Sequence, residues 1–152
     1  PVADLRVRAA ALRGIAVPPE LVPLAIDEFP ALFVAAACAH GRTVVTGAAE
    51  LRVKESDRIA VMADGLRALG VEATPTADGM VIEGRGEQDA VFAPGAVHAH
   101  ADHRIAMSFA IAGLRAAGEL MVHDAANVAT SFPGFEVLAR TAGLRIEGHS
   151  QA

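Results

Sequence analysis

Two segments of this sequence follow the same order, and each contains a helix-length stretch that is apolar on every side. In the first segment, FPALFVAAACA is followed by a histidine and a glycine, by RTVVTG and then by a charged cluster. In the second, RIAMSFAIAGLRAA is followed by a glycine and by ELMVHD. A helix that is apolar all round has to be covered on all sides. The sequence therefore predicts an α+β fold of repeated units, with sheets packed around buried helices.

The first unit, residues 27–97, is predicted to hold a helix, a strand, a second helix and a hairpin. Gly41 and Gly70 are expected to end the two helices. VEATP and GMVIEG, joined through ADG, predict the hairpin. The second helix is expected to bury one face, formed by Ile59, Met62, Leu66 and Leu69.

The second unit, residues 98–148, is predicted to repeat these steps. Gly118 and Gly143 are expected to end its helices, and LRIE is predicted to be the closing strand. DLRVRAA, near the start of the chain, predicts a further strand. The inner face of the second helix is expected to be formed by Phe135, Leu138, Ala139 and Ala142.

Composition narrows the classes of function. The 152 residues are 53% hydrophobic and carry a net charge of −5, which argues against nucleic acid or an anionic membrane as the main partner. The longest apolar runs, residues 29–39 and 105–114, are too short to span a bilayer. The single cysteine, Cys38, is expected to be a small buried residue. Because one cysteine allows no disulfide framework, we expect a reducing compartment, the cytoplasm. A start at Pro1 without a methionine suggests a piece of a longer protein.

Polar residues that could bind an anion or transfer a proton gather where helices are expected to begin. Helix N-termini offer unpaired N–H groups, so several that converge would bind a phosphate or carboxylate. Arg58 and Arg104 add forked donors for such anions, and Asp27, Glu55 and His103 could move protons. On spacing alone, a solvated charged helix start explains residues 54–58 as well. The four clusters are Asp27–Glu28, Lys54–Arg58, Asp102–Arg104 and Thr130–Ser131.

Both apolar helices are preceded by an aspartate, Asp27 in the first unit and Asp102 in the second. Aspartate is a favoured residue at the N-cap, where its carboxylate accepts a backbone N–H of the first turn. Taken singly, each aspartate is therefore predicted to cap its helix.

A zinc hydrolase is an alternative from another class. HAHADH has the form H-x-H-x-D-H, which places imidazoles and a carboxylate around metal ions. Such a motif is expected directly after an apolar strand, whereas APGAV precedes it here. The candidate ligands are His98, His100, Asp102 and His103.

Four motifs in order carry a family resemblance: IDEFP, LRVKESDRIAVMADGLRALG, ADHRIAMSFAIAGL and ATSFPGF. Together, over about residues 3–147, they resemble the 5-enolpyruvylshikimate 3-phosphate synthase family of enolpyruvyl transferases. The resemblance implies an enzyme of two similar domains, each an α/β prism of three βαβαββ units, with the active site between them. Residues 1–152 would be part of the C-terminal domain, about two units, and the N-terminal domain would be the missing partner.

The activity implied by the resemblance belongs to the shikimate pathway of aromatic amino acid biosynthesis. The family transfers the enolpyruvyl group of phosphoenolpyruvate to the 5-hydroxyl of shikimate 3-phosphate, releases phosphate, and needs no metal or organic cofactor. A fragment without its partner domain is expected to be inactive. A catalytically silent domain that uses the same fold for binding is the third alternative.

The resemblance also implies roles for individual residues. Asp27 matches the aspartate that contacts the shikimate hydroxyls and assists deprotonation, and Lys54 lies beside the attacking hydroxyl. Glu55 matches an acid proposed to transfer a proton at the methylene carbon, although which group serves each proton step is left open. Arg58 and Arg104 match arginines that hold the carboxylate and phosphate of phosphoenolpyruvate. The same wall is completed by Asp102 and His103.

Two positions depart from the pattern of many members. Thr130 stands where many have a lysine that contacts phosphoenolpyruvate, and Glu50 stands where many have an asparagine. Both features resemble a branch known for tolerance of glyphosate, a property that also depends on the other domain. The sister enzyme that acts on a UDP-sugar lacks KESDR and DHRIAM, so the resemblance implies the shikimate substrate.

Overall fold

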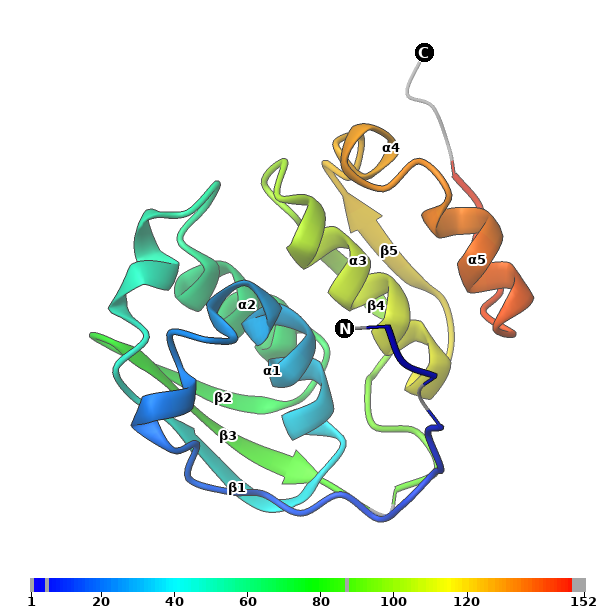
Figure 1. The fold of residues 1–152 in the computed structure, drawn as a ribbon. Helices are drawn as coiled ribbons and strands as arrows, with labels where there is room; N and C mark the ends of the chain where they lie inside the picture. Colours follow the sequence, from blue (N-terminus) through cyan, green and yellow to red (C-terminus); the bar gives the residue numbers. More distant parts are fainter. Residues whose placement is uncertain (1, 5, 87, 149–152) are drawn as a thin grey trace.

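The computed structural model describes residues 2–4, 6–86 and 88–148 of the chain. Helices α1 (Phe29–Ala37) and α2 (Arg58–Ala68) lie on a three-stranded sheet. Helix α3 (His103–Ala112) packs against α1 on one side and against strand β5 (Leu120–His123) on the other. Figure 1 shows α3 between the first sheet with its helices and the C-terminal helices. The predicted arrangement of sheets around central helices is thus present, in an incomplete form.

The three-stranded sheet belongs to the first unit and has the order β1-β3-β2 with antiparallel pairing throughout. Its strands are β1 (His40–Val45), β2 (Glu72–Thr76) and β3 (Gly79–Arg85). The predicted hairpin is confirmed, because Thr76 pairs with Gly79 across a two-residue turn. The side chains that this sheet turns toward the helices, among them Val45, Met80 and Ile82, are fully buried.

The helices of the first unit agree with the prediction except at one end. The predicted inner face of α2 is completely buried, and Gly70, with φ +82°, follows the helix in a conformation that suits glycine. Helix α1 ends at Ala37, four residues before Gly41. The prediction that Gly41 stops the helix is wrong, because β1 already begins at His40 and has to pair with β3 from there.

The second unit has two strands that pair in parallel, β4 (Gly95–His98) and β5, with His98 opposite His123. Short 3-10 turns connect the elements elsewhere in the chain. They are η1 (Pro19–Leu21), η2 (Ile26–Glu28), η3 (Ala49–Val53) and η4 (Gly113–Arg115). Two short helices, α4 (Val128–Ser131) and α5 (Phe135–Thr141), follow β5.

The second apolar helix is not wholly buried, contrary to the prediction. Phe109 and Ala112 of α3 are in the core, but Ile111 and, just beyond the helix, Leu114 are exposed. On α5, Phe135 is buried as expected, whereas Leu138 is 56% exposed and Ala142 is exposed too. Within the described residues, the face of α3 that carries Ile111 and the face of α5 that carries Leu138 have no cover.

Two predicted strands are absent from the described residues. LRIE contains no strand, because a strand needs a neighbour for its backbone groups and this segment packs on α5 only through Leu144 and Ile146. Leu5 of DLRVRAA lies outside the described residues, and the rest of that segment has no strand either. The chain instead meets β1 farther on, through single parallel bridges at Arg13 and Ala16.

No helix in the described ranges is long and apolar enough to cross a membrane.

Candidate functional site

Helices α1, α2 and α3 begin at the same end of the molecule, the upper end in Figure 1. Arg58 is the first residue of α2, and its side chain is only 1% exposed. It forms ion pairs with Asp27, just before α1, and with Asp102, just before α3. The predicted convergence of these three helix starts therefore rests on direct contacts with one guanidinium.

Arg58 binds three carboxylates through its guanidinium. Its Nε donates to Asp102 Oδ2 at 2.8 Å, and its Nη2 reaches Asp102 Oδ1 at 3.4 Å. Its Nη1 donates to Asp27 Oδ1 at 3.0 Å, and Nη2 also donates to Glu55 Oε2 at 2.5 Å. Burial acts to lower the pKa of Arg58, but the three carboxylates, Asp102 first, raise it overall and keep the guanidinium charged. Their hydrogen bonds also fix the plane of the guanidinium. That Arg58 itself binds an anionic group of a substrate stays a prediction.

Asp102 is fully buried and is the N-cap of α3, which confirms the capping prediction at this position. Its carboxylate accepts the N–H of Arg104 at 3.0 Å and of Ile105 at 3.4 Å, and the hydroxyl of Ser56 at 3.1 Å. Burial acts to raise the pKa of Asp102, but the hydrogen bonds and charge of Arg58 outweigh it and lower that pKa. Ser56 was not singled out from the sequence, although it lies inside KESDR.

Asp27 is not a helix cap, so the capping prediction is wrong here. Helix α1 begins at Phe29 with Glu28 in the cap position, and Asp27 lies in the preceding 3-10 turn. Its side chain is 46% exposed and turns to Arg58 and to Lys54, whose Nζ is 3.5 Å from Oδ1. Burial acts to raise the pKa of Asp27, but the bond from Arg58 and the charge of Lys54 lower it overall.

Lys54 lies between two acids. Its Nζ donates to Glu50 Oε1 at 2.5 Å and stands next to Asp27. The hydrogen bond to Glu50, with the nearby charge of Asp27, raises the pKa of Lys54 above its ordinary value despite some desolvation. Glu50, which the sequence marked only as a departure from a family pattern, thus helps to keep Lys54 protonated.

Arg104 joins the same group from the second unit. Its Nη1 donates to Glu28 Oε1 at 2.9 Å and to the backbone carbonyl of Asp27 at 3.1 Å. His103 is the half-buried first residue of α3. Contacts therefore link six of the predicted residues into one cluster, which we call the Arg58 cluster. Its members are Asp27, Lys54, Glu55, Arg58, Asp102 and Arg104.

Thr130 lies outside the contacts of the Arg58 cluster. It is an exposed residue of α4, which packs against α3, and its hydroxyl donates to the carbonyl of Asn127 at 3.1 Å. Asn127 in turn bonds to Ala101, the neighbour of Asp102, so Thr130 lies near the start of α3. Within the described residues, its hydroxyl makes no hydrogen bond to the acids and bases of the cluster. Its predicted contact with a substrate stays a prediction.

The structure gives no support to the zinc alternative. Among the residues it describes, no three His, Cys, Asp or Glu side chains are arranged to hold a metal ion. The Asp102 carboxylate points to Arg58, and both of its oxygens already accept hydrogen bonds, so neither is left for a metal ion. The His98 ring instead stacks on that of His123, with centroids 4.7 Å apart, and its Nδ1 is 3.5 Å from Asp124.

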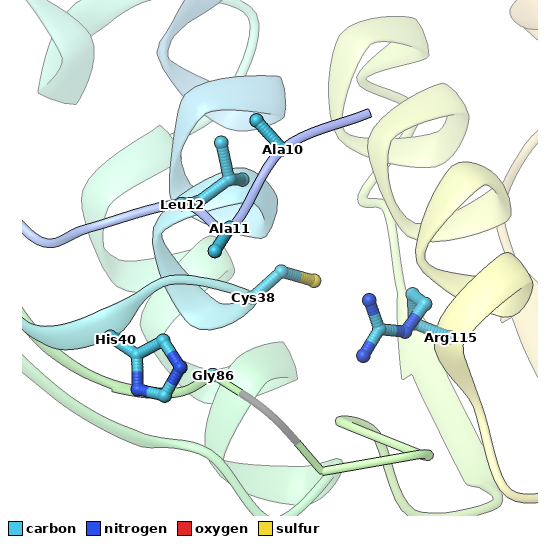
Figure 2. Close-up of a pocket in the computed structure, with 7 residues that line it drawn as sticks. All are labelled: Ala10, Ala11, Leu12, Cys38, His40, Gly86 and Arg115. Atoms are coloured by element: carbon cyan, nitrogen blue, oxygen red, sulfur yellow. The ribbon is translucent and has the colours of Figure 1, made fainter. Parts of the chain in front are cut away.

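Two hollows lie away from the Arg58 cluster. One, of about 250 Å³, runs between α2 and β4 and includes His98 and His100. The other, of about 230 Å³, is shown in Figure 2, where the Cys38 sulfur points toward the Arg115 guanidinium. Cys38 is half-buried and not fully buried as predicted, and burial raises the pKa of its thiol, which makes it a poor nucleophile. The second hollow is lined by Ala10, Ala11, Leu12, Cys38, His40, Gly86 and Arg115.

The Arg58 cluster combines the groups needed for chemistry on an anion. Arg58 is buried and holds two half-exposed carboxylates, those of Asp27 and Glu55, in fixed positions. Lys54 and Arg104 stand beside Asp27 and add positive charge. Such an arrangement can place proton-transferring carboxylates next to cations that bind a phosphate or carboxylate.

Comparisons with known proteins agree on one family. Residues 1–138 match the family model described as EPSP synthase (3-phosphoshikimate 1-carboxyvinyltransferase). The chain is 66% identical to the 3-phosphoshikimate 1-carboxyvinyltransferase of Methylococcus capsulatus over 97% of its length. It is 65% identical to that of Nitrosococcus oceani over 96% of its length. The match covers 32% of each of these relatives, so the chain spans about a third of their length.

A solved structure of EPSP synthase from Acinetobacter baumannii matches with 61% identity and a TM-score of 0.88. This match covers 90% of the chain and 32% of that structure. The described part of the chain therefore has the mixed helix and strand fold of the matching third of EPSP synthase.

Proposed function

The chain belongs to the EPSP synthase family, and we propose that it forms one wall of the active site of an enzyme that transfers the enolpyruvyl group of phosphoenolpyruvate to the 5-hydroxyl of shikimate 3-phosphate. Inorganic phosphate is the second product. The support is the family match over residues 1–138 together with the Arg58 cluster. Because the chain spans a third of its relatives, the activity is that of the longer protein.

One observation carries the proposal: Arg58 holds the carboxylates of Asp27 and Glu55 next to each other, both open to solvent. The reaction needs two proton transfers close together. A hydroxyl loses its proton as its oxygen attacks the enol carbon, and the methylene carbon gains a proton. Loss of phosphate and of one proton from the resulting methyl group then restores the carbon–carbon double bond and gives the enol ether product. Two carboxylates on one guanidinium meet this requirement.

The pKa shifts favour different roles for Asp27 and Lys54. The lowered pKa of Asp27 keeps it ionised near neutral pH, so it can accept the hydroxyl proton. The raised pKa of Lys54 keeps it protonated, so it can offset the negative charge of the substrates. Glu55 is then the group that we assign to the proton at the methylene carbon, since Arg58 positions it 2.5 Å from Nη2.

The remaining cationic and polar residues are assigned to the anionic groups of the substrates. Arg104, held by Glu28 and the Asp27 carbonyl, is placed to bind the carboxylate or phosphate of phosphoenolpyruvate. His103 and Thr130 stand at the same end of α3 and complete this wall. Asp102 and Arg58 act beneath them, because both are buried and bonded to each other.

The proposal includes the place of the chain in the longer protein. Residues 1–152 form part of the C-terminal domain, with repeat units at 27–97 and 98–148, and the rest of the protein supplies the opposite wall. Neither of the two hollows described above includes a residue of the cluster, and the side chains of Asp27 and Glu55 are half-exposed. Substrates bound to this chain alone would stay hydrated. We therefore propose that the isolated chain is inactive. Because the sequence has a single cysteine and so no disulfide framework, we also propose that the longer enzyme works in the cytoplasm.

A chimera tests the function. This chain would replace the matching third of the Acinetobacter baumannii EPSP synthase, and phosphate release from phosphoenolpyruvate and shikimate 3-phosphate would be measured. We expect turnover by the chimera and none by the 152-residue chain alone. A folded chimera without turnover, or a chain that turns over alone, would contradict the proposal.

Two matched substitutions in the chimera test the assignment of Glu55. Glu55→Gln keeps the size and some hydrogen bonding of the side chain but cannot deliver a proton, so kcat should fall roughly 10²–10⁴-fold. Glu72→Gln makes the same chemical change at an exposed position of β2 and should leave kcat unchanged. Equal rates for the two variants would remove Glu55 from the mechanism.

A further inference from the structure

The backbone that leads into Asp102 makes an unusual turn. The N–H of Asp102 donates to the carbonyl of Ala99 at 2.9 Å, and the two residues between them, His100 and Ala101, have φ +50° and +57°. Two central residues with positive φ are typical of a type I′ turn, which favours glycine and asparagine. Histidine and alanine carry a Cβ that this conformation crowds, so the turn needs support from its surroundings.

Both ends of the turn are fixed in the core. Ala99 is fully buried, and its N–H donates to the carbonyl of His123 at 3.0 Å. Asp102 is fully buried in its bonds to Arg58 and α3. The strained centre of the turn lies between these anchors and is exposed.

Among the residues that the structure describes, one side chain, that of Asn127, donates a hydrogen bond to the backbone of this centre. Its Nδ2 donates to the carbonyl of Ala101 at 2.6 Å. Asn127 stands in the cap position of α4, but its side chain makes no cap bond there. The amide is therefore used for the turn and not for its own helix.

Asn127 also connects the turn with Thr130. The backbone carbonyl of Asn127 accepts the hydroxyl of Thr130 at 3.1 Å and the N–H of Ser131 at 3.0 Å. Hydrogen bonds thus join Thr130 to Asn127 and Asn127 to Ala101. The peptide bond after Ala101 leads directly to Asp102, whose carboxylate binds Arg58.

We propose that Asn127 is a positioning residue that holds the His100–Ala101 turn in its left-handed conformation and thereby sets the position of Asp102. A shift of Asp102 would move Arg58, and with it the carboxylates of Asp27 and Glu55, because one guanidinium binds all three. In the described part of the chain, the Asn127 side chain hydrogen-bonds to Ala101 and to none of these acids. The inference rests on the proposed function only where catalysis is measured.

Hydrogen exchange of the Asp102 amide in the 152-residue chain tests the proposal without any assay of activity. Asn127→Asp keeps the shape of the side chain but removes the N–H donor, and it should speed exchange of this amide about three- to tenfold, as loss of one hydrogen bond does. Ala101→Gly removes the crowded Cβ, so adding it to Asn127→Asp should restore slow exchange. Thr141→Ala, on the exposed side of α5, is the control and should change nothing at Asp102.

The chimera gives the catalytic readout. Asn127→Asp should lower kcat about three- to tenfold, and the double variant with Ala101→Gly should recover it. A general weakening of the fold would not be rescued by a glycine in the turn. Unchanged exchange at Asp102 in Asn127→Asp, or no rescue by Ala101→Gly, would overturn the inference. An inactive chimera with the native sequence would count against the proposed function alone, because the exchange experiment still decides the role of Asn127.

Discussion

Asp27 and Asp102 occupy the same place in the two repeated units, just ahead of an apolar helix, yet their surroundings differ. Asp102 is fully buried and caps α3, and its carboxylate accepts hydrogen bonds from four residues: from the side chains of Arg58 and Ser56 and from two backbone N–H groups. Asp27 is 46% exposed, caps nothing and binds only the tips of Arg58 and Lys54. One unit buries its aspartate inside the Arg58 cluster, and the other leaves its aspartate half-exposed at the surface of that cluster.

The two units also differ in how completely they are covered. The first unit closes a three-stranded sheet over α1 and α2. The second has only the β4–β5 pair, and one side of α3 and α5 stays open in the described part of the chain. A repeated pattern in the sequence thus predicts where elements begin, whereas burial and strand pairing depend on which neighbours are present.

The largest difference in stability is expected between variants of the two aspartates. Asp102→Ala leaves the buried charge of Arg58 without its main partner and removes the cap of α3, so it should lower the free energy of unfolding by about 3–5 kcal/mol. Asp27→Ala removes a half-exposed ion pair and should lower it by at most about 1 kcal/mol. Urea unfolding of both variants measures the difference. Equal losses would show that the two sites do not differ in the way that burial indicates.

The contact between the units can be tested with glycines. A methyl group on Gly65, in α2, would overlap the ring of Phe109, in α3, which is fully buried. Such overpacking costs about 1–3 kcal/mol, against which alanine gains up to about 1 kcal/mol of helix propensity. Gly65→Ala should therefore lower the free energy of unfolding by about 1 kcal/mol.

The matched control for this experiment is Gly113→Ala. Gly113 follows α3 with a helical φ of −55°, and a methyl group there would meet only Leu144, at an ordinary 3.5 Å. The substitution should leave stability unchanged or raise it. If both alanines behaved alike, the interface between α2 and α3 would be looser than the structure shows.

Acid is expected to affect the two units unequally. Asp27 and Asp102 both have a lowered pKa in the folded chain, so the unfolded chain takes up protons first as pH falls. Their stabilisation is present above the unfolded pKa, near 3.8, and is lost as pH falls through the lower folded values. Between about pH 5 and 2, the free energy of unfolding should depend less on pH in Asp102→Asn than in Asp27→Asn, because Asp102 is buried. Urea unfolding at several pH values would decide, and a larger effect of Asp27→Asn would contradict the comparison.

The sequence predicted the first unit well because its elements cover one another. The inner face of α2 and the β2–β3 hairpin follow from local spacing, and their partners lie within the same stretch of chain. The motifs predicted which residues belong to the Arg58 cluster, but not that Arg58 would be its buried centre. No spacing rule says that Arg58 would be buried among three acids. Nor does one say that Ser56 would bond to Asp102, or that Glu50 would bond to Lys54. Such contacts depend on packing between distant segments.

The smallest effect is expected where helical periodicity predicted burial and the structure shows none. Leu138 recurs at helical spacing with Phe135 in α5, yet it is 56% exposed, because the side of α5 on which it lies has no cover in the described residues. Leu138→Ala removes little buried surface and should change the free energy of unfolding by less than about 0.5 kcal/mol. Leu66→Ala is the matched control: Leu66 has the same place on the inner face of α2, is fully buried, and its loss should cost about 2–5 kcal/mol. Because the two substitutions remove the same atoms, any difference in the free energy of unfolding, measured with urea, reflects how far each leucine is buried. A loss near 2 kcal/mol for Leu138→Ala would mean that the second unit covers α5 more fully than the structure shows, and the contrast between the two units would then fail.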